Sequence, residues 1–199
     1  MKKLESTWYN MAIVLTLISL VAGAALAYVN EITKGPIAEI QQNNEARAIK
    51  AVLCDEGAVI TDTIVAENGV VLYLTENGAA VKTPDPTNGS FSGGLTIMVG
   101  LTKDLKVLGY TVLVSNETPG LGAKADEWFQ EGGKGNIIGK TAGKLATTKD
   151  NGDVDAITAS TITTRSFLRA INHASAEYAK VLNPGQEVDA MTSATEQNH

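Results

Sequence analysis

The chain has 199 residues, 44% of them hydrophobic, and a formal net charge of −6, which suits one domain of ordinary size with additional segments. The acidic balance and the absence of a lysine or arginine cluster leave no surface for a phosphate backbone, so we expect no nucleic-acid partner. One cysteine, Cys54, excludes an internal disulfide framework, and two histidines are too few for a structural zinc or iron–sulfur site.

The first predicted element is a membrane-spanning helix over residues 11–29. This run carries no charged side chain and is just long enough to cross a hydrocarbon layer of about 30 Å, so we expect it to contact lipid. Trp8, Tyr9 and Tyr28 lie near its ends, where aromatic rings favour the headgroup region. The lysines that precede the run place residues 1–10 in the cytoplasm and the later residues outside.

A cleavable signal peptide is the alternative for this segment. Ala25-Leu26-Ala27 resembles the A-x-A pattern at which signal peptides are cut. The length of the apolar run favours a retained anchor. Both alternatives export the residues that follow.

Residues 30–54 are predicted to form a stalk helix that holds the following domain away from the membrane. Proline is favoured in the first turn of a helix, and Gly35-Pro36 begins a pattern of apolar residues on one face. This face comprises Ile37, Ile40, Ile49, Val52 and Leu53.

An antiparallel sheet is predicted within residues 55–183. Apolar, β-branched runs there alternate with Asn-Gly dipeptides and a Lys-Asp pair, which are typical of tight turns. Because strands come first and a long helix comes last, we expect an α+β domain with a C-terminal helix. The strands are expected within Val59–Val81, Leu95–Leu101 and Val107–Val114.

The segment before the last helix is rich in hydroxyl groups, which six of the nine residues from Thr158 to Ser166 carry. The first turn of a helix has unpaired backbone N–H groups and a partial positive charge, so this segment is suited to a phosphate. The alternative is an ordinary N-cap, for which serine and threonine are preferred anyway. The apolar face of the helix is expected to comprise Ile162, Leu168, Ile171, Tyr178, Val181 and Leu182.

A second unusual segment, Glu-Thr-Pro-Gly-Leu-Gly, extends from Glu117 to Gly122, after the strand expected to end at Val114. Its Pro-Gly pair makes a tight turn, and its two glycines let backbone N–H groups approach a flat ligand closely. The alternative is a tight turn that binds nothing.

Together the two segments resemble one family, the FMN-binding domain of the G subunit of Rnf complexes and of the C subunit of sodium-pumping NADH:quinone reductases. The chain is also similar to that family in its short start, its single N-terminal span and the Gly93-Gly94 entry into an apolar strand. The resemblance extends from the anchor to about Leu182 and implies that FMN is the cofactor.

The resemblance also implies which residues hold the FMN. In the family, the threonine that ends an Asp-x-x-Ser/Thr-Gly-Ala-Thr sequence is esterified to the FMN phosphate by a separate flavin transferase. Thr161 corresponds to this threonine, and Asp155 and Thr158 match the recognition positions. Two small residues, Ala159 and Ser160, replace the glycine and alanine of the family, and Ser160 is also expected to bind the cofactor. The flavin ring is then expected against Glu117, Thr118, Gly120, Leu121 and Gly122.

A second copy of the pattern lies in the polar segment 184–199, which we expect to be a flexible tail. This copy runs from Asp189 to Thr195, so Thr195 is a rival attachment site. No helix is expected after it that would bring unpaired N–H groups to the phosphate, and we therefore favour Thr161.

Other polar or aromatic residues near these segments are weaker candidates. Lys124 is expected to be solvated, Trp128 to belong to the core and His173 to lie on the surface. Arg165 and Arg169 are one helical turn apart, and they either attract the FMN phosphate or are ordinary exposed helix charges.

By resemblance, the chain is expected to be an electron-carrying subunit of an ion-translocating ferredoxin:NAD oxidoreductase, with its FMN domain on the periplasmic side of a bacterial inner membrane. It has no complete active site of its own, so ferredoxin, NAD and the ions are expected to bind other membrane and peripheral subunits. One alternative is the equivalent subunit of a Na⁺-translocating NADH:quinone reductase. Another is a membrane-anchored binding module with the same fold and no redox role.

Overall fold

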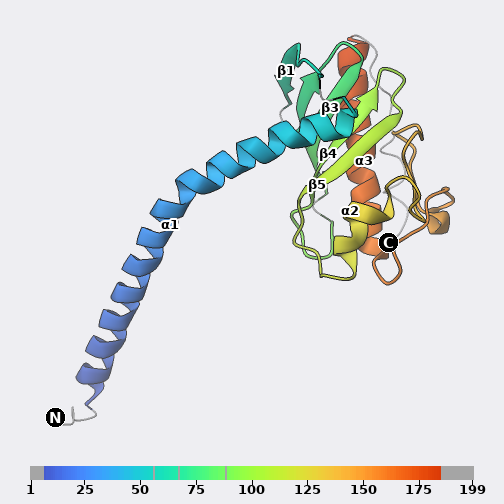
Figure 1. Cartoon of the computed structure of the whole chain (residues 1–199). Helices are drawn as coiled ribbons and strands as arrows, with labels where there is room; N and C mark the ends of the chain where they lie inside the picture. Colours follow the sequence, from blue (N-terminus) through green and yellow to red (C-terminus); the bar gives the residue numbers. More distant parts are fainter. Residues whose placement is uncertain (1–6, 56, 67, 88, 185–199) are drawn as a thin grey trace. The chain divides into compact units, whose positions relative to one another are not determined.

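The structure is a computed structural model that describes residues 7–55, 57–66, 68–87 and 89–184 (Figure 1). The rival site Thr195 and residues 1–6 lie outside this described part. The chain forms two compact units, Met1–Asn44 and Glu45–His199, which are treated separately below.

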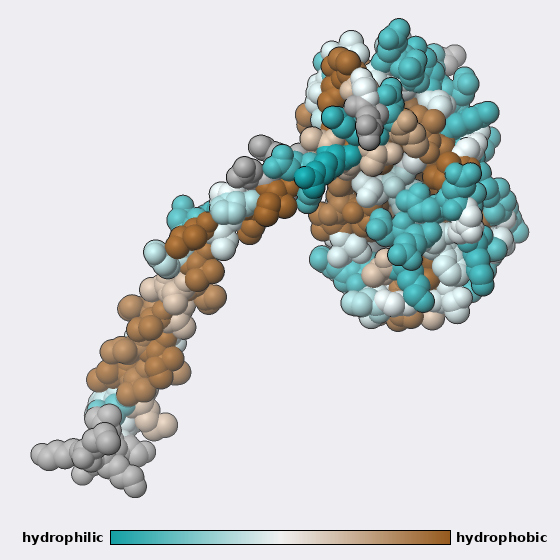
Figure 2. All heavy atoms as spheres, in the orientation of Figure 1, coloured by the Kyte–Doolittle hydropathy of each residue, from teal (hydrophilic) through white to brown (hydrophobic). Residues whose placement is uncertain are grey.

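Helix α1 spans Trp8–Leu53 without interruption. Its part from Trp8 to Ile37 is long and apolar enough to cross a membrane by length and composition, and Figure 2 shows apolar side chains covering this part of the helix. The sequence pattern predicts a new helix at Gly35-Pro36, but Pro36 lies inside α1. Proline lacks one N–H group and does not interrupt this helix, although it removes a hydrogen bond.

Five strands form one antiparallel sheet in which each strand pairs with the next one along the chain, in the order β1-β2-β3-β4-β5. The turn at Asn68-Gly69 is closed by a hydrogen bond from the Ala66 N–H to the Val70 carbonyl (2.8 Å), and Gly69 has the positive φ (80°) that favours glycine. The predicted α+β class is confirmed. The strands are β1 (Asp62–Val65), β2 (Val71–Leu74), β3 (Gly78–Pro84), β4 (Thr96–Thr102) and β5 (Val107–Val114).

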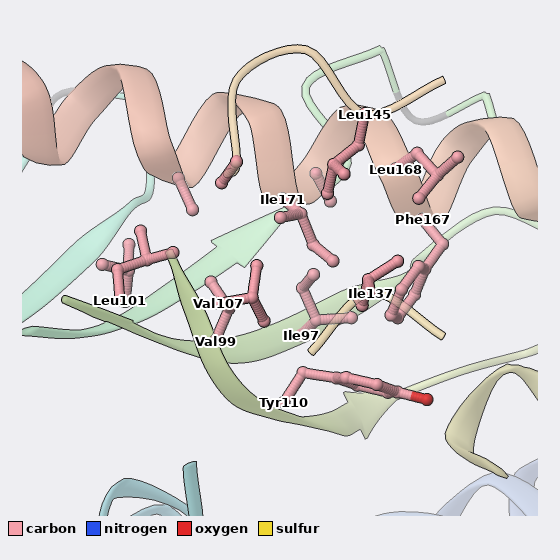
Figure 3. Close-up of a cluster of buried hydrophobic side chains, with 14 of the residues drawn as sticks. Ile97, Val99, Leu101, Val107, Tyr110, Ile137, Leu145, Phe167, Leu168 and Ile171 are labelled. Atoms are coloured by element: carbon pink, nitrogen blue, oxygen red, sulfur yellow. The ribbon is translucent and has the colours of Figure 1, made fainter. Parts of the chain in front are cut away.

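Helix α3 (Thr161–Leu182) covers one face of the sheet, and the main hydrophobic core lies between them (Figure 3). Phe167 is central to this core because its ring stacks on Phe129 (4.5 Å between centroids) and meets the edge of Tyr110 (4.9 Å). Leu168, Ile171 and Tyr178 are buried as predicted from the helical pattern. Ile162 was expected on the same face, but it is 51% exposed because it lies in the first turn, beyond the edge of the core.

The last turns of α1 cover the opposite face of the sheet, where Ile49, Val52 and Leu53 form a second, smaller core with Ala80 and Met98. Two glycines of the sheet make this contact possible. A Cβ atom on Gly100 would lie 2.0 Å from the Val52 carbonyl oxygen, and one on Gly109 would lie 3.1 Å from it. The Glu45 carboxylate pairs with Lys82 at this junction, so the end of α1 is part of the domain.

Short elements follow β5 and lead toward α3. They are the 3-10 helices η1 (Gly122–Lys124) and η2 (Thr148–Asp150) and the one-turn helix α2 (Ala125–Trp128). The Tyr110 hydroxyl on β5 donates to the carbonyl of Ala125 at 2.7 Å, which fixes α2 against the sheet. This contact fixes one end of the connection between β5 and α2, and the Glu117–Gly122 segment is part of that connection.

Candidate functional site

A cavity of about 320 Å³ opens at the N-terminal end of α3. Its lining comes from three separate parts of the chain: Phe91 in the segment between β3 and β4, the turn after β5, and the start of α3 with the residues before it. The two segments singled out in the sequence therefore face one cavity. The lining residues are Phe91, Glu117, Thr118, Leu121, Gly122 and Ala159–Thr163.

Glu117 joins the parts of this lining. Its side chain is buried, with the residue only 7% exposed. One carboxylate oxygen accepts a hydrogen bond from the Thr163 hydroxyl (2.8 Å), and the other accepts one from the Ser92 backbone N–H (3.2 Å). Gly122 packs so closely that a Cβ atom there would lie 2.6 Å from a Glu117 carboxylate oxygen. The carboxylate thus serves as a link between loops and helix.

The hydroxyl groups before and within α3 fall into two sets. Three of them bind the protein itself: Thr163 donates to Glu117, Thr164 donates to the Ser160 carbonyl (3.0 Å), and Ser166 donates to Asp85 (2.5 Å). Within the described part of the chain, the hydroxyls of Thr158, Ser160 and Thr161 make no such bond, and Ser160 at the N-cap does not cap the helix through its side chain. Capping therefore does not explain the hydroxyl-rich segment.

Ser160 and Thr161 are the two of these free hydroxyl residues that line the cavity. Ser160 is buried, whereas Thr161 is partly exposed and is the first residue of α3. The backbone N–H groups in this first turn have no intrahelical acceptor and carry the positive end of the helix dipole. A hydroxyl and unpaired N–H groups together are the chemistry that a phosphate ester requires.

Ala159 has a left-handed backbone conformation, with φ at 62°. Glycine adopts this conformation freely, and the resembling family has glycine at this position. Ala159 therefore has a backbone conformation that a glycine would adopt without strain. The Cβ atom introduces strain, because side chains disfavour this region.

Three of the nine residues proposed from the sequence do not line the cavity. Asp155 is exposed, and its backbone carbonyl accepts a hydrogen bond from the indole N–H of Trp128 (2.8 Å). Thr158 is exposed as well. Gly120 shapes the turn through its positive φ (78°), in the Pro-Gly arrangement that the sequence predicts.

The structure adds Phe91, Ala159, Ile162 and Thr163 to the lining, and none of them was proposed as a binding residue from the sequence. Phe91 is 71% exposed, Leu121 42% and Ile162 51%, so apolar side chains surround the cavity. Helical spacing predicts Ile162 on the core face of α3, so the sequence pattern does not indicate that its side chain lines the cavity. For Phe91, its position shortly before Gly93-Gly94 was the available signal, and it is a weak one.

Both arginines of α3 have carboxylate partners in the protein. Arg165 binds Asp150 through two hydrogen bonds of 2.8 and 2.6 Å, which lower the pKa of Asp150 to about 2. Arg169 binds Asp85 at 3.1 Å. Neither guanidinium lines the cavity, so nothing in this arrangement assigns them to a phosphate.

The remaining weak candidates also lie outside the cavity lining. Lys124 is exposed, and Trp128 is partly buried and packs against the main core. His173 is partly buried rather than on the surface, and its Nε2 lies 3.1 Å from the Asn68 side-chain nitrogen. Burial lowers the pKa of His173, and the nearby Glu177 carboxylate opposes this effect.

Two family models match the chain. The model of the FMN-binding domain matches residues 90–176, which include the cavity, and the model of the RnfG N-terminal region matches residues 1–52. Fold, site and family models together define a membrane-anchored protein with an FMN-binding domain. The apolar lining, the free hydroxyls and the unpaired N–H groups suit FMN, whose ring is flat and whose phosphate is anionic.

Similar proteins narrow this class further. The G subunit of the Na⁺-translocating ferredoxin:NAD⁺ oxidoreductase complex of Acetobacterium woodii is 32% identical over 198 residues, which cover 86% of this chain and 93% of that protein. The G subunit of the ion-translocating oxidoreductase complex of Shewanella amazonensis is 30% identical (77% and 80% covered), and that of Yersinia pestis is 31% identical (85% and 90%). The chain belongs to the family of G subunits of ion-translocating oxidoreductase complexes.

Proposed function

We propose that this chain carries electrons through an FMN whose phosphate is esterified to Thr161. The observation that carries the proposal is the hydroxyl of Thr161, which lines the cavity at the first residue of α3 and makes no hydrogen bond within the described residues. Ser160 and Thr118 also line the cavity, and their hydroxyls make no hydrogen bond to the described residues. However, Ser160 is buried, and Thr118 lies in the turn after β5 rather than in α3. Thr161 alone combines access for an esterifying enzyme with a place in the first turn of α3.

The ester would hold the cofactor outside the cytoplasm, where a dissociating FMN would be lost. In forming it, Thr161 Oγ1 bonds to the phosphorus of an activated flavin nucleotide, whose leaving group departs while the hydroxyl proton passes to a base. Among the described residues, the cavity lining contains no histidine, and its one carboxylate, Glu117, already has two hydrogen-bond partners. The base would therefore come from a flavin transferase, as expected for a weakly nucleophilic threonine.

FMN supplies one- and two-electron transfer when it is bound. The residues of the chain bind and orient it. The unpaired N–H groups of the first turn of α3 donate to its phosphate, and the exposed side chains of Phe91, Leu121 and Ile162 offer apolar contacts to its ring. Glu117 keeps the two halves of the site together through Ser92 and Thr163.

The similarity to the Acetobacterium woodii protein supports a role in a complex that moves electrons between ferredoxin and NAD⁺ while it translocates ions. In this proposal ferredoxin, NAD⁺ and the ions bind other subunits. Residues 11–29 contact lipid, and the FMN domain lies on the periplasmic side of a bacterial inner membrane, as the lysines before the span indicate.

Coexpression of the full chain with a flavin transferase and an export pathway tests the proposal. We expect yellow fluorescence that stays with the polypeptide after denaturation, and peptide mass mapping should place the added mass on Thr161. Thr161→Val should abolish the fluorescence, and Thr195→Val should leave it unchanged. A colourless wild-type band would favour a binding module without a redox role, and fluorescence retained in Thr161→Val would reject the site.

A further inference from the structure

The segment between β3 and β4 is fastened at its start by a buried carboxylate. The side chain of Asp85 has no exposed area, and its oxygens accept hydrogen bonds from the Ser166 hydroxyl (2.5 Å) and the Arg169 guanidinium (3.1 Å) of α3. The same carboxylate also accepts bonds from the backbone N–H groups of Thr87 (3.2 Å) and Gly89 (2.8 Å). Asp85 thus shapes its own loop and attaches that loop to the helix.

The far end of this segment is fastened in a similar way. The Ser92 N–H donates to Glu117, whose other oxygen accepts from Thr163. Thr163 and Ser166 are three positions apart and therefore lie on the same side of α3. Two buried carboxylates consequently attach the described residues of this segment, 85–87 and 89–92, to one side of the helix, one at each end.

Phe91 lies between these two attachments. It lines the cavity although 71% of it is exposed, so the protein itself gives the ring little packing to hold it there. With Leu121 and Ile162, which are also exposed and line the cavity, Phe91 forms a group of exposed apolar side chains, and such a group is typical of a binding site. The place of Phe91 over the cavity is set by its backbone, and the backbone is set by the two carboxylates.

We propose that Phe91 forms one apolar wall of the flavin site and that Asp85 is a positioning residue which holds this wall in place. This inference rests on the proposed function, because the wall has its purpose only when a flavin occupies the cavity. Asp85 does not touch the cavity, and five donors from Ser166, Arg169, Thr87 and Gly89 engage its carboxylate. Its effect on the flavin is therefore transmitted through the loop.

Iodide quenching of flavin fluorescence in the flavinylated full chain tests the wall. We expect the quenching constant to roughly double in Phe91→Ala and to rise similarly in Asp85→Asn, since an aromatic contact that shields the ring is lost. Asp150→Asn is the matched control, because it also removes a carboxylate partner of an α3 arginine but lies outside the loop. An unchanged constant in Phe91→Ala overturns the wall.

Hydrogen exchange of residues 85–94 tests the positioning role without any flavin, in the Thr161→Val background. We expect Asp85→Asn to speed exchange there about tenfold, the factor expected for a lost hydrogen bond to a charged group. Phe91→Ala should not change it, and Ser166→Ala should give a smaller increase if Asp85→Asn fails to fold. Unchanged exchange in Asp85→Asn, or in Ser166→Ala where Asp85→Asn does not fold, rejects Asp85 as the positioning residue. A colourless wild type rejects the proposed function and the wall, whereas the exchange result still decides the role of Asp85.

Discussion

The carboxylate of Glu117 accepts a hydrogen bond of 2.8 Å from the hydroxyl of Thr163, and this bond joins the turn after β5 to the first turn of α3. The two residues are 46 positions apart in the chain and belong to the two segments that stand out in the sequence. Their contact explains why both segments line one cavity. It also makes the shape of the cavity depend on this buried carboxylate.

Removal of this carboxylate should loosen the site. Glu117→Ala leaves the Thr163 hydroxyl and the Ser92 N–H without their acceptor, so we expect the free energy of unfolding to fall by about 1–3 kcal/mol. Flavin attached to Thr161 should become more mobile, which fluorescence anisotropy measures. Glu131→Ala, at an exposed site, is the control and should change neither quantity. Equal stability of the two variants would show that the link is not important.

Restoring glycine at position 159 should stabilise the protein. Ala159 has φ at 62°, which is strained for a residue with a side chain. Glycine relieves this strain but makes the unfolded chain more flexible, which partly offsets the gain. We therefore expect Ala159→Gly to raise the free energy of unfolding by about 0.5–1 kcal/mol. Urea unfolding followed by tryptophan fluorescence measures this gain. Ala176→Gly, within α3, should have the opposite sign because glycine disfavours helices. A loss of stability in both variants would contradict the conformation given for Ala159.

The contact between the end of α1 and the sheet should not tolerate a side chain at Gly100. The new Cβ atom would lie 2.0 Å from the Val52 carbonyl oxygen, which is backbone and cannot rotate away. We expect Gly100→Ala to reduce the free energy of unfolding by about 1–3 kcal/mol, as overpacked cores do. In Gly57→Ala the nearest atom is at 3.4 Å, and the change should stay within about 0.5 kcal/mol. Similar midpoints of urea unfolding for the two variants would contradict the packing.

The ion pair of Asp150 and Arg165 should contribute stability only above acid pH. Hydrogen bonds from Arg165 lower the pKa of Asp150 from 3.8 to about 2, so the contribution is complete above about pH 4 and is lost as the pH falls toward 2. Because the pair is partly exposed, we expect Asp150→Asn to cost less than about 1 kcal/mol at pH 6. Urea midpoints of wild type and variant should approach each other as the pH falls through 2 and converge by about pH 1. A difference that persists there would point to the Thr147 hydrogen bond instead.

Local patterns predicted much of the fold. Three predicted features depend only on neighbouring residues, and all are found in the structure. They are the Asn68-Gly69 turn, the succession of apolar strands and turns, and the helical spacing of Leu168, Ile171 and Tyr178. Pro36 shows the limit of such patterns, because a local rule predicts a helix start where α1 continues. Ile162 shows the same limit: helical spacing predicts it in the core, but it is exposed because spacing does not indicate where the core ends.

The sequence by itself determined the apolar anchor, the antiparallel α+β domain and the two segments that line the site, because each depends on residue types close together in the chain. Only the tertiary structure decided which hydroxyls are free, since Glu117 and Asp85 approach Thr163 and Ser166 from distant segments. It also brought Phe91 to the cavity and gave Ala159 its left-handed conformation. Contacts between residues far apart in sequence set these features, and no local pattern encodes such contacts.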